Sequence, residues 1–320
     1  MIGLLLALAV LAGDADDQRP DVLVVVGAEG TEEYGRQFRQ WAGRWKDAAD
    51  RGHASFAAIG LDEPGETSDR DLLKRRLEEE VARGRNEPLW LVFIGHGTFD
   101  GKTAKFNLRG PDVSSSELTA WLAACERPLA VINCASASGP FINELSGANR
   151  VVITATKSGF EHNFARFGDY LSAAIADPGA DLDKDDETSL LEAFLLAAGQ
   201  VRQFYESDAR LATEHALIDD NGDRLGTPAD WFRGLRATKS AKDGASLDGL
   251  RAGQFQLVAS GRQPPLPAEA RSRRDELEAA IARLRQQKGS VPDDEYYAQL
   301  EPLLVEIARV YVKEDGTRGE

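Results

Sequence analysis

The chain has 320 residues, of which 42% are hydrophobic and 28% charged, so it is long enough for one large or two small globular domains. This composition excludes a disordered chain or a collagen. Asp and Glu number 53 against 38 Lys and Arg, and the resulting net charge of −15 repels a phosphate backbone, so we expect no nucleic-acid partner.

The chain begins with an apolar run over residues 2–12, which is too short to span a bilayer as a helix. We therefore expect no integral membrane span. Small residues at Ala12 and Gly13 suit cleavage, and a polar segment follows. Residues 1–13 are therefore predicted to be a secretory signal peptide, which would place the mature protein in the periplasm or outside the cell. The alternative is an apolar N-terminal strand or helix.

From residue 21 to 157, short apolar runs alternate with amphipathic stretches, a pattern typical of βαβ units and a mostly parallel sheet. One amphipathic stretch is preceded by Ser68 with Asp71 three residues later, which predicts a helix cap. The predicted fold class is α/β, an open and mostly parallel sheet with helices on both faces, in a domain over residues 20–260. The predicted strands are residues 22–26, 55–59, 89–94, 129–132 and 151–155.

Two more helices are predicted at 164–176 and 190–205, and a late strand at 254–259. A Pro-rich break over 261–267 follows. Beyond it, two apolar stripes separated by Gly and Pro predict an antiparallel helical hairpin over residues 266–314. The hairpin would cover the active-site face as a pro-segment, dock a protein partner, or simply pack against the scaffold.

The two cysteines, Cys125 and Cys134, are not expected to form a disulfide. The segment between them reads as a buried strand, which would hold the sulfurs beyond the reach of a bridge. Cys134 is thus expected to be a free thiol.

Chemistry is expected in the loops at the carboxyl ends of the strands, where parallel sheets place their sites. The third strand is followed by Gly95-His96-Gly97, and the fourth by Asn133-Cys134. Neighbouring parallel strands would bring His96 and Cys134 together as general acid/base and nucleophile. The Gly97 and Cys134 N–H groups would form an oxyanion hole, often worth roughly 3 kcal/mol or more per donor. Taken separately, Cys134 could instead be an ordinary residue of the core, and His96 an ordinary hydrogen-bonded structural residue.

These residues resemble those of the caspase-like cysteine peptidases and, among them, the legumain family. That group also has a strand ending in His-Gly followed by a strand ending in the nucleophilic Cys. Further segments over roughly residues 21–223 resemble legumain motifs in the same order: Gly27-Ala28-Glu29-Gly30 with Tyr34, Thr154-Ala155-Thr156 with Glu161, and Gly168-Asp169-Tyr170.

The resemblance implies a caspase-like fold and a cysteine endopeptidase that needs no cofactor. It makes Cys134 the nucleophile, His96 the acid/base and Gly97 an oxyanion donor. Glu29 stands where legumains have the asparagine that orients the histidine. Its carboxylate would hold the imidazole tautomer; the alternative is a solvated loop residue.

The substrate would be a peptide or protein, but the specificity residues depart from the legumain pattern. Legumains have an arginine directly after the matching tyrosine, whereas this chain has Gly35 and then Arg36. Asp169 matches a pocket aspartate, and His162 and Asn163 stand near the positions of paired serines. Arg36 with Asp169 would favour cleavage after Asn or Asp; Asp169 alone would favour Lys or Arg.

The alternative function is a non-catalytic caspase-like module that binds peptides or assembles partners. In such a module the same pockets remain, but turnover is lost.

An acidic stretch also resembles an EF-hand calcium loop, with oxygen-bearing residues at positions 1, 3, 5, 9 and 12. Its candidate calcium ligands are Asp181, Asp183, Asp185 and Glu192. Its sixth position is Asp186 rather than the glycine that the sharp turn requires, so the alternative is an acidic cap for the following helix.

Overall fold

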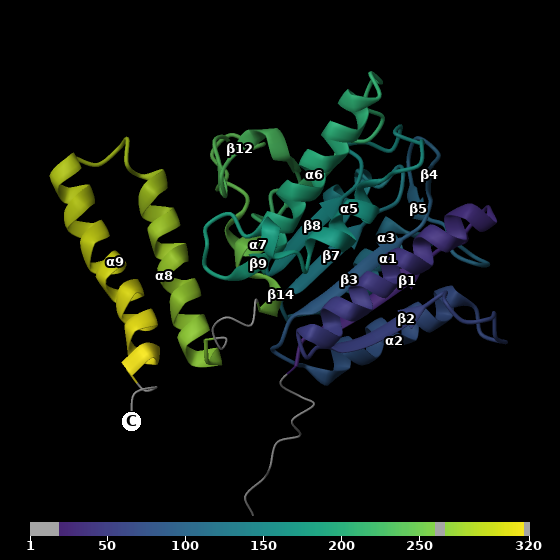
Figure 1. The fold of residues 1–320 in the computed structure, drawn as a ribbon, viewed down its shortest axis with the longest axis horizontal. Coiled ribbons are helices and arrows are strands. Elements are labelled where there is room, and N and C mark those ends of the chain that lie inside the picture. Colours follow the sequence, from purple (N-terminus) through teal and green to yellow (C-terminus); the bar gives the residue numbers. More distant parts are fainter. Residues whose placement is uncertain (1–18, 260–265, 317–320) are drawn as a thin grey trace, which may run out of the picture.

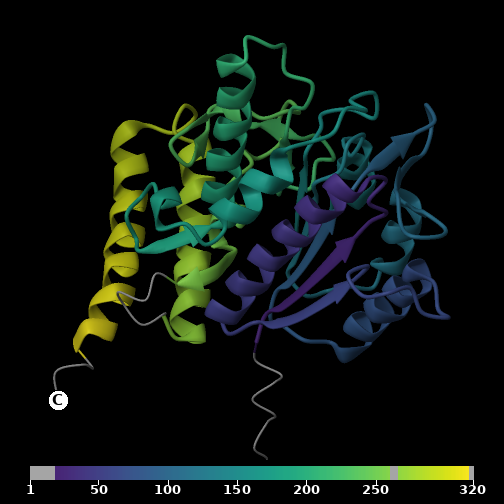
Figure 2. The ribbon, with the colours of Figure 1, turned by 45° about the vertical axis from the view of Figure 1, so that its right-hand side comes forward.

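The computed structural model describes residues 19–259 and 266–316, in which one seven-stranded sheet lies between two layers of helices (Figures 1 and 2). The strand order is β11-β10-β8-β7-β3-β1-β2. The five predicted strands pair in parallel, and β10 and β11 add an antiparallel edge. The strands are β1 (Asp21–Val26), β2 (Ser55–Ile59), β3 (Leu89–Ile94), β7 (Leu129–Asn133), β8 (Arg150–Thr154), β10 (Leu217–Asp219) and β11 (Thr227–Pro228). The predicted signal peptide, residues 1–13, lies outside the described residues.

The predicted α/β architecture is confirmed, with helices on both faces of the sheet. One face packs on α1, α5 and α6, and the other on α2, α3 and α4. Because the central strands are buried on both sides, their sequences are continuous apolar runs rather than alternating ones. The helices are α1 (Glu32–Arg51), α2 (Asp69–Arg83), α3 (Ser115–Trp121), α4 (Pro140–Leu145), α5 (Phe167–Ala174), α6 (Leu190–Ser207) and α7 (Leu250–Gln254).

The helix starts agree with their cap residues. The Ser68 hydroxyl accepts a hydrogen bond from the Asp71 N–H at 3.2 Å, which confirms the predicted cap of α2. Thr31 caps α1 in the same way, through the Tyr34 N–H at 3.4 Å. Each cap satisfies a backbone donor that the helix itself leaves unpaired.

Two smaller sheets matter for the site. Directly after β3, the strands β4 (Gly97–Phe99), β5 (Ala104–Phe106) and β6 (Val113–Ser114) form an antiparallel sheet that the sequence analysis did not predict. The late strand is present as β14 (Gln256–Ala259), but it pairs with β9 (Glu187–Ser189) outside the main sheet. Short strands β12 (Phe232–Arg233) and β13 (Arg236–Ala237) form one more pair.

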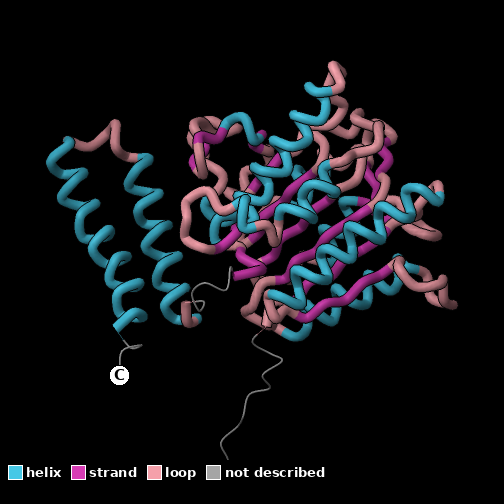
Figure 3. Tube along the Cα trace, viewed as in Figure 1, coloured by secondary structure: helices cyan, strands magenta, loops and turns pink. Residues whose placement is uncertain are grey.

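The predicted C-terminal hairpin is present as α8 (Ala268–Gln286) and α9 (Asp293–Gly316). Arg274 on α8 is buried and lies 3.7 Å from the Glu187 carboxylate of β9. In Figures 1 to 3 the hairpin lies on the side of the molecule opposite β4. It therefore does not cover the carboxyl edge of β3. None of the helices in residues 19–259 and 266–316 is long and apolar enough to cross a membrane.

A buried ion-pair network ties β1, α2 and β7 together at the amino edge of the sheet. Arg127, with 2% of its side chain exposed, donates to the Asp21 carboxylate at 2.9 Å and to the Glu80 carboxylate at 3.0 Å. Removing one partner of such a network leaves uncompensated buried charge.

We predict that Arg127→Met lowers the free energy of unfolding by about 3 kcal/mol, because Asp21 and Glu80 lose the buried cation that joins them. Each carboxylate keeps a more exposed partner, Arg85 for Asp21, and Arg76 and Arg83 for Glu80, which limits the loss. Urea-induced unfolding measures this change. Arg202→Met, which breaks an exposed pair with Glu206, serves as the control and should cost less than about 1 kcal/mol. Similar losses in the two variants would contradict a structural role for the network.

Candidate active site

The register of β3 against β7 brings their carboxyl ends together. Phe93 lies opposite Asn133 in this parallel pair. If the same register continues for three more residues on each strand, His96 lies opposite Ser136. The Ser136 hydroxyl accepts a hydrogen bond from the Gly97 N–H at 3.3 Å and lies 3.3 Å from the Gly97 carbonyl oxygen, to which it donates. The segment after β3 is therefore joined directly to the loop after β7.

Gly97 is needed for this close approach. A Cβ atom at this position would lie 2.2 Å from the Ser136 carbonyl oxygen and 3.2 Å from the Lys105 carbonyl oxygen. Both neighbours are backbone atoms that cannot turn away. Position 97, the predicted oxyanion donor, can therefore hold only glycine unless the loop moves.

His96 is half-buried in an aromatic environment. Its ring lies edge-on to Tyr34 and Phe38, with centroids 5.0 and 5.3 Å away, and 6.0 Å from the Phe164 ring. Burial lowers the pKa of His96 below its ordinary value of 6.5, although a hydrogen bond to Glu29 opposes this shift. His96 is therefore a neutral imidazole at neutral pH, the form that can accept a proton.

Glu29 contacts His96 through its backbone rather than through the predicted carboxylate. His96 Nε2 lies 3.3 Å from the Glu29 carbonyl oxygen. Because a carbonyl can only accept, Nε2 carries the hydrogen and Nδ1 keeps its lone pair. The Glu29 carboxylate instead lies 3.4 Å from the Arg39 guanidinium.

Cys134 lies on the same side of the sheet as His96, but in the environment of a core residue. It is 1% exposed and packs in the core cluster that also contains Ile94 and Trp41. A Cβ on Gly168 would lie 2.8 Å both from Cys134 Cβ and from the Trp41 ring. Burial, followed by the Glu214 carboxylate, raises the pKa of the Cys134 thiol well above its usual value. In the described part of the chain, no hydrogen bond joins His96 to Cys134 or Ser136. Both cysteines are free, as expected.

The structure does not pair the predicted specificity residues with one another. Arg36 is exposed and lies 3.3 Å from Glu32, one turn away on α1. The Asp169 carboxylate instead accepts a hydrogen bond from Arg44 at 2.6 Å. His162 and Asn163 are exposed in the loop after β8, where the His162 ring lies edge-on to Phe160. Asp169 is therefore already neutralised by a cation other than Arg36.

Three groups at this edge have no role in the prediction from sequence. Ser136 is the first, and the register of the two strands is the signal that points to it. The others are Glu161 and His215: the Glu161 carbonyl accepts from the Ala137 N–H at 2.8 Å, and its carboxylate lies 2.5 Å from His215 Nδ1. These contacts hold the loop that carries Ser136, but they join distant segments that no local motif connects.

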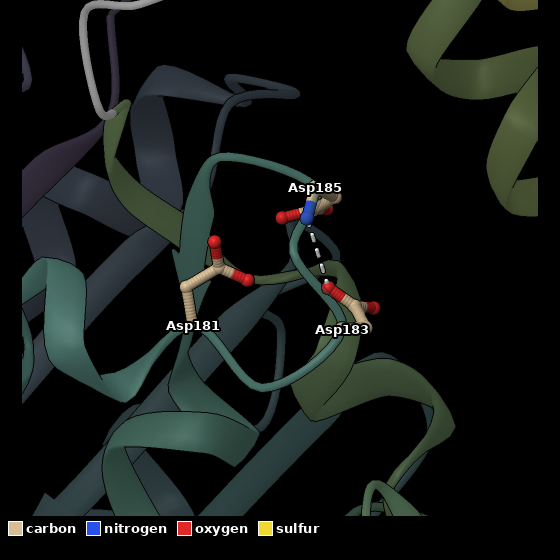
Figure 4. Close-up of side chains that lie close together, drawn as sticks. All are labelled: Asp181, Asp183 and Asp185. Atoms are coloured by element: carbon tan, nitrogen blue, oxygen red, sulfur yellow. Dashed lines mark hydrogen bonds between the residues drawn. The ribbon is translucent and has the colours of Figure 1, made fainter.

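The acidic loop brings together three of the four predicted calcium ligands. One carboxylate oxygen each of Asp181, Asp183 and Asp185 lies within 4.8 Å of the others (Figure 4). Asp186 adopts a left-handed φ of 68°, the turn that an EF-hand loop needs at its sixth position. Glu192 is engaged elsewhere: its carboxylate accepts from the Leu182 N–H at 2.7 Å and closes the capping box of α6 with Ser189.

Comparisons with known proteins found similarity at the level of structure. No protein-family model matches the chain, and no curated protein matches it. Among solved structures, the chain is similar to the Drosophila initiator caspase Dronc, at 13% identity and a TM-score of 0.44, over 65% of this chain and 81% of that one. It is also similar to caspase-1 from Spodoptera frugiperda, at 8% identity and a TM-score of 0.42, over 63% and 86%. Similarity of this extent assigns neither an activity nor a specificity.

Proposed function

We propose that the chain is a peptide hydrolase of the caspase-like class that forms an acyl-enzyme at the carboxyl edge of β3 and β7. One observation carries this proposal. A neutral histidine, oriented by a backbone carbonyl, stands directly before a glycine N–H that points at the loop after the neighbouring strand. A general base, an oxyanion donor and a nucleophile-bearing loop are the three parts that acyl transfer needs.

The chain's residues support a two-stage reaction. His96 Nδ1 accepts the proton of the nucleophile as that atom attacks the peptide carbonyl, and the Gly97 N–H stabilises the resulting oxyanion. The protonated imidazole then gives the proton to the departing amine. Water hydrolyses the acyl-enzyme by the same route in reverse. The sequence predicts Cys134 as the nucleophile, and the shared order of motifs supports the legumain type within the class.

Cleavage after Asn or Asp stays a prediction from the motif positions. Among residues 19–259 and 266–316, the exposed Glu32 is the one ion-pair partner of Arg36, so the guanidinium can meet a substrate carboxyl or carboxamide. The Asp169 carboxylate already binds the Arg44 guanidinium, so Asp169 would contribute to substrate recognition by holding Arg44 in place. Profiling of cleavage sites in a peptide library would report this preference.

The second candidate is a peptide-binding module without turnover, and the burial of Cys134 favours it. A thiol that is 1% exposed and lies near a carboxylate cannot readily become a thiolate. A protein partner at the α8–α9 hairpin stays a further prediction. Tyr297 and Leu304, which are exposed on α9, are side chains that such a partner would meet.

The test of hydrolysis is His96→Ala. We expect the purified chain to cleave a mixed peptide library, and the variant to lose about 100-fold or more of kcat/KM, since general base catalysis is typically worth this much. His53→Asn is the matched control, because His53 is exposed at the amino end of β2, away from the site. Peptide binding that persists in His96→Ala, with no cleavage by either protein, would identify the binding module instead.

The pH dependence follows from the His96 pKa. Because burial lowers this pKa below 6.5, His96 is protonated and inactive as a base only in acid. We predict that kcat/KM rises with pH through a midpoint below 6.5 and is flat across neutral pH. A rate profile measured from pH 4 to 8 checks this. A midpoint clearly above 6.5 would contradict the lowered pKa of His96, and a rate that falls as the pH rises would show that the imidazolium is the active form.

We further propose that the acidic loop binds calcium through Asp181, Asp183 and Asp185. Asp185 is exposed, but partial desolvation of its carboxyl group, followed by the negative charges of Asp183 and Glu187, raises its pKa to about 7. A cation must then displace a proton, so binding strengthens as the pH rises.

We predict that millimolar calcium raises the melting temperature more at pH 8 than at pH 6. Asp183→Asn should abolish this rise, since it removes one exposed carboxylate from the cluster. Magnesium at the same concentration controls for ionic strength. A melting temperature that calcium leaves unchanged at both pH values would exclude the site.

A further inference from the structure

We infer that Ser136, rather than Cys134, is the nucleophile of the proposed peptide hydrolase. This inference rests on the proposed function, and it changes the class of enzyme from a thiol to a serine peptidase. It follows from where each side chain lies relative to the oxyanion donor and from what surrounds it.

The Ser136 hydroxyl lies at the predicted oxyanion site, whereas the sulfur of Cys134 belongs to the core. Ser136 Oγ is 3.3 Å from both the Gly97 nitrogen and the Gly97 carbonyl oxygen. Cys134 packs against Trp41 and Gly168, beneath the first turn of α5. Both residues are buried, at 4% and 1% exposure, so their contacts rather than their exposure distinguish them.

The loop is built to hold residue 136 in place. Ala137 has a left-handed φ of 53°, and its N–H donates to the Glu161 carbonyl. On the other side of Ser136, the Ala135 N–H donates to the Asn133 side chain at 3.0 Å. The neighbours of Ser136 are thus fixed on both sides, while the Ser136 N–H has no acceptor within residues 19–259 and 266–316. That N–H and the Gly97 N–H are the two donors available for an oxyanion.

The surrounding charges favour a hydroxyl over a thiolate. The buried Glu214 carboxylate disfavours a negative sulfur at Cys134. A serine needs no anion in the resting state, because a neutral imidazole takes its proton only as the new bond forms. The lowered pKa of His96 maintains that neutral imidazole.

The reaction balances without a further reagent. As Ser136 Oγ attacks the peptide carbonyl carbon, its proton passes to His96 Nδ1 and the carbonyl π electrons move onto oxygen. The C–N bond then breaks, the amine leaves with the proton from His96, and a serine ester remains. Water attacks the ester, giving one proton through His96 back to Ser136 Oγ and releasing the carboxylic acid. Before attack, Oγ must rotate from the Gly97 N–H toward His96, which frees that N–H for the oxyanion.

Two matched variants test the inference, because Ser136→Ala and Cys134→Ala each remove only the reactive atom. We expect Ser136→Ala to lose about a thousandfold or more of kcat/KM, and Cys134→Ala to stay within tenfold of the parent. A fluorophosphonate probe should label the parent protein, and fragmentation of the labelled peptide should place the adduct on Ser136. Circular dichroism verifies that each variant is folded.

The double variant Cys134→Ala with Ser136→Cys keeps the test decisive if Ser136→Ala does not fold. It restores a nucleophile at position 136, and we expect its hydrolysis to become sensitive to iodoacetamide. If Cys134→Ala loses activity while Ser136→Ala keeps it, the inference is wrong and the peptidase function stands. Hydrolysis without a phosphonate adduct on Ser136 would likewise overturn the inference. If His96→Ala and Ser136→Ala both keep the full rate, the proposed function itself fails.

Discussion

The pairing of β3 with β7 is the interaction on which the candidate site depends. Both strands are buried on two faces, so alternate residues are committed to different cores: Val92 and Ile132 to one, Phe93 and Val131 to the other. A slip of one residue would move every side chain to the wrong core, which fixes the register strongly. The same register sets Gly97 against Ser136. The packing of apolar side chains thus determines the geometry of a polar site, although none of those side chains takes part in its chemistry.

The sequence was sufficient to predict the sheet, because each central strand is an apolar run and Ser68 marks a helix start. It was also sufficient to place His96 and Gly97 at a strand end. The position of the proposed nucleophile, Ser136, could not be derived in the same way. Ending the third strand at Ile94 and the fourth at Ile132 places Cys134 at the same offset as His96, whereas the observed register sets Ile132 opposite Val92, two residues earlier. An error of two residues in the register therefore selects a different side chain for the proposed chemistry.

Contacts between distant segments account for the rest of what could not be predicted. Glu161 and His215 are 54 positions apart, yet they meet beside Ala137. The carbonyl of Glu29, not its carboxylate, orients His96. A backbone atom has no signature in the sequence, so a motif can identify the right residue while assigning the role to the wrong atom. Likewise, Arg44 rather than Arg36 binds Asp169 because α1 presents Arg44 to the start of α5.

The packing of Trp41 against Gly168 has a consequence for mutations far from any substrate. Gly168 lets the indole lie against Cys134, and a Cβ there would come within 2.8 Å of both. Because Cys134 is the first residue after β7, this close packing joins the start of the loop to α1 and α5. A larger side chain at position 168 would therefore displace the loop without removing a reactive group. Enzymatic rate and thermal tolerance would decline together in such a variant, so a glycine selected for packing would behave in a genetic screen like a member of the active site.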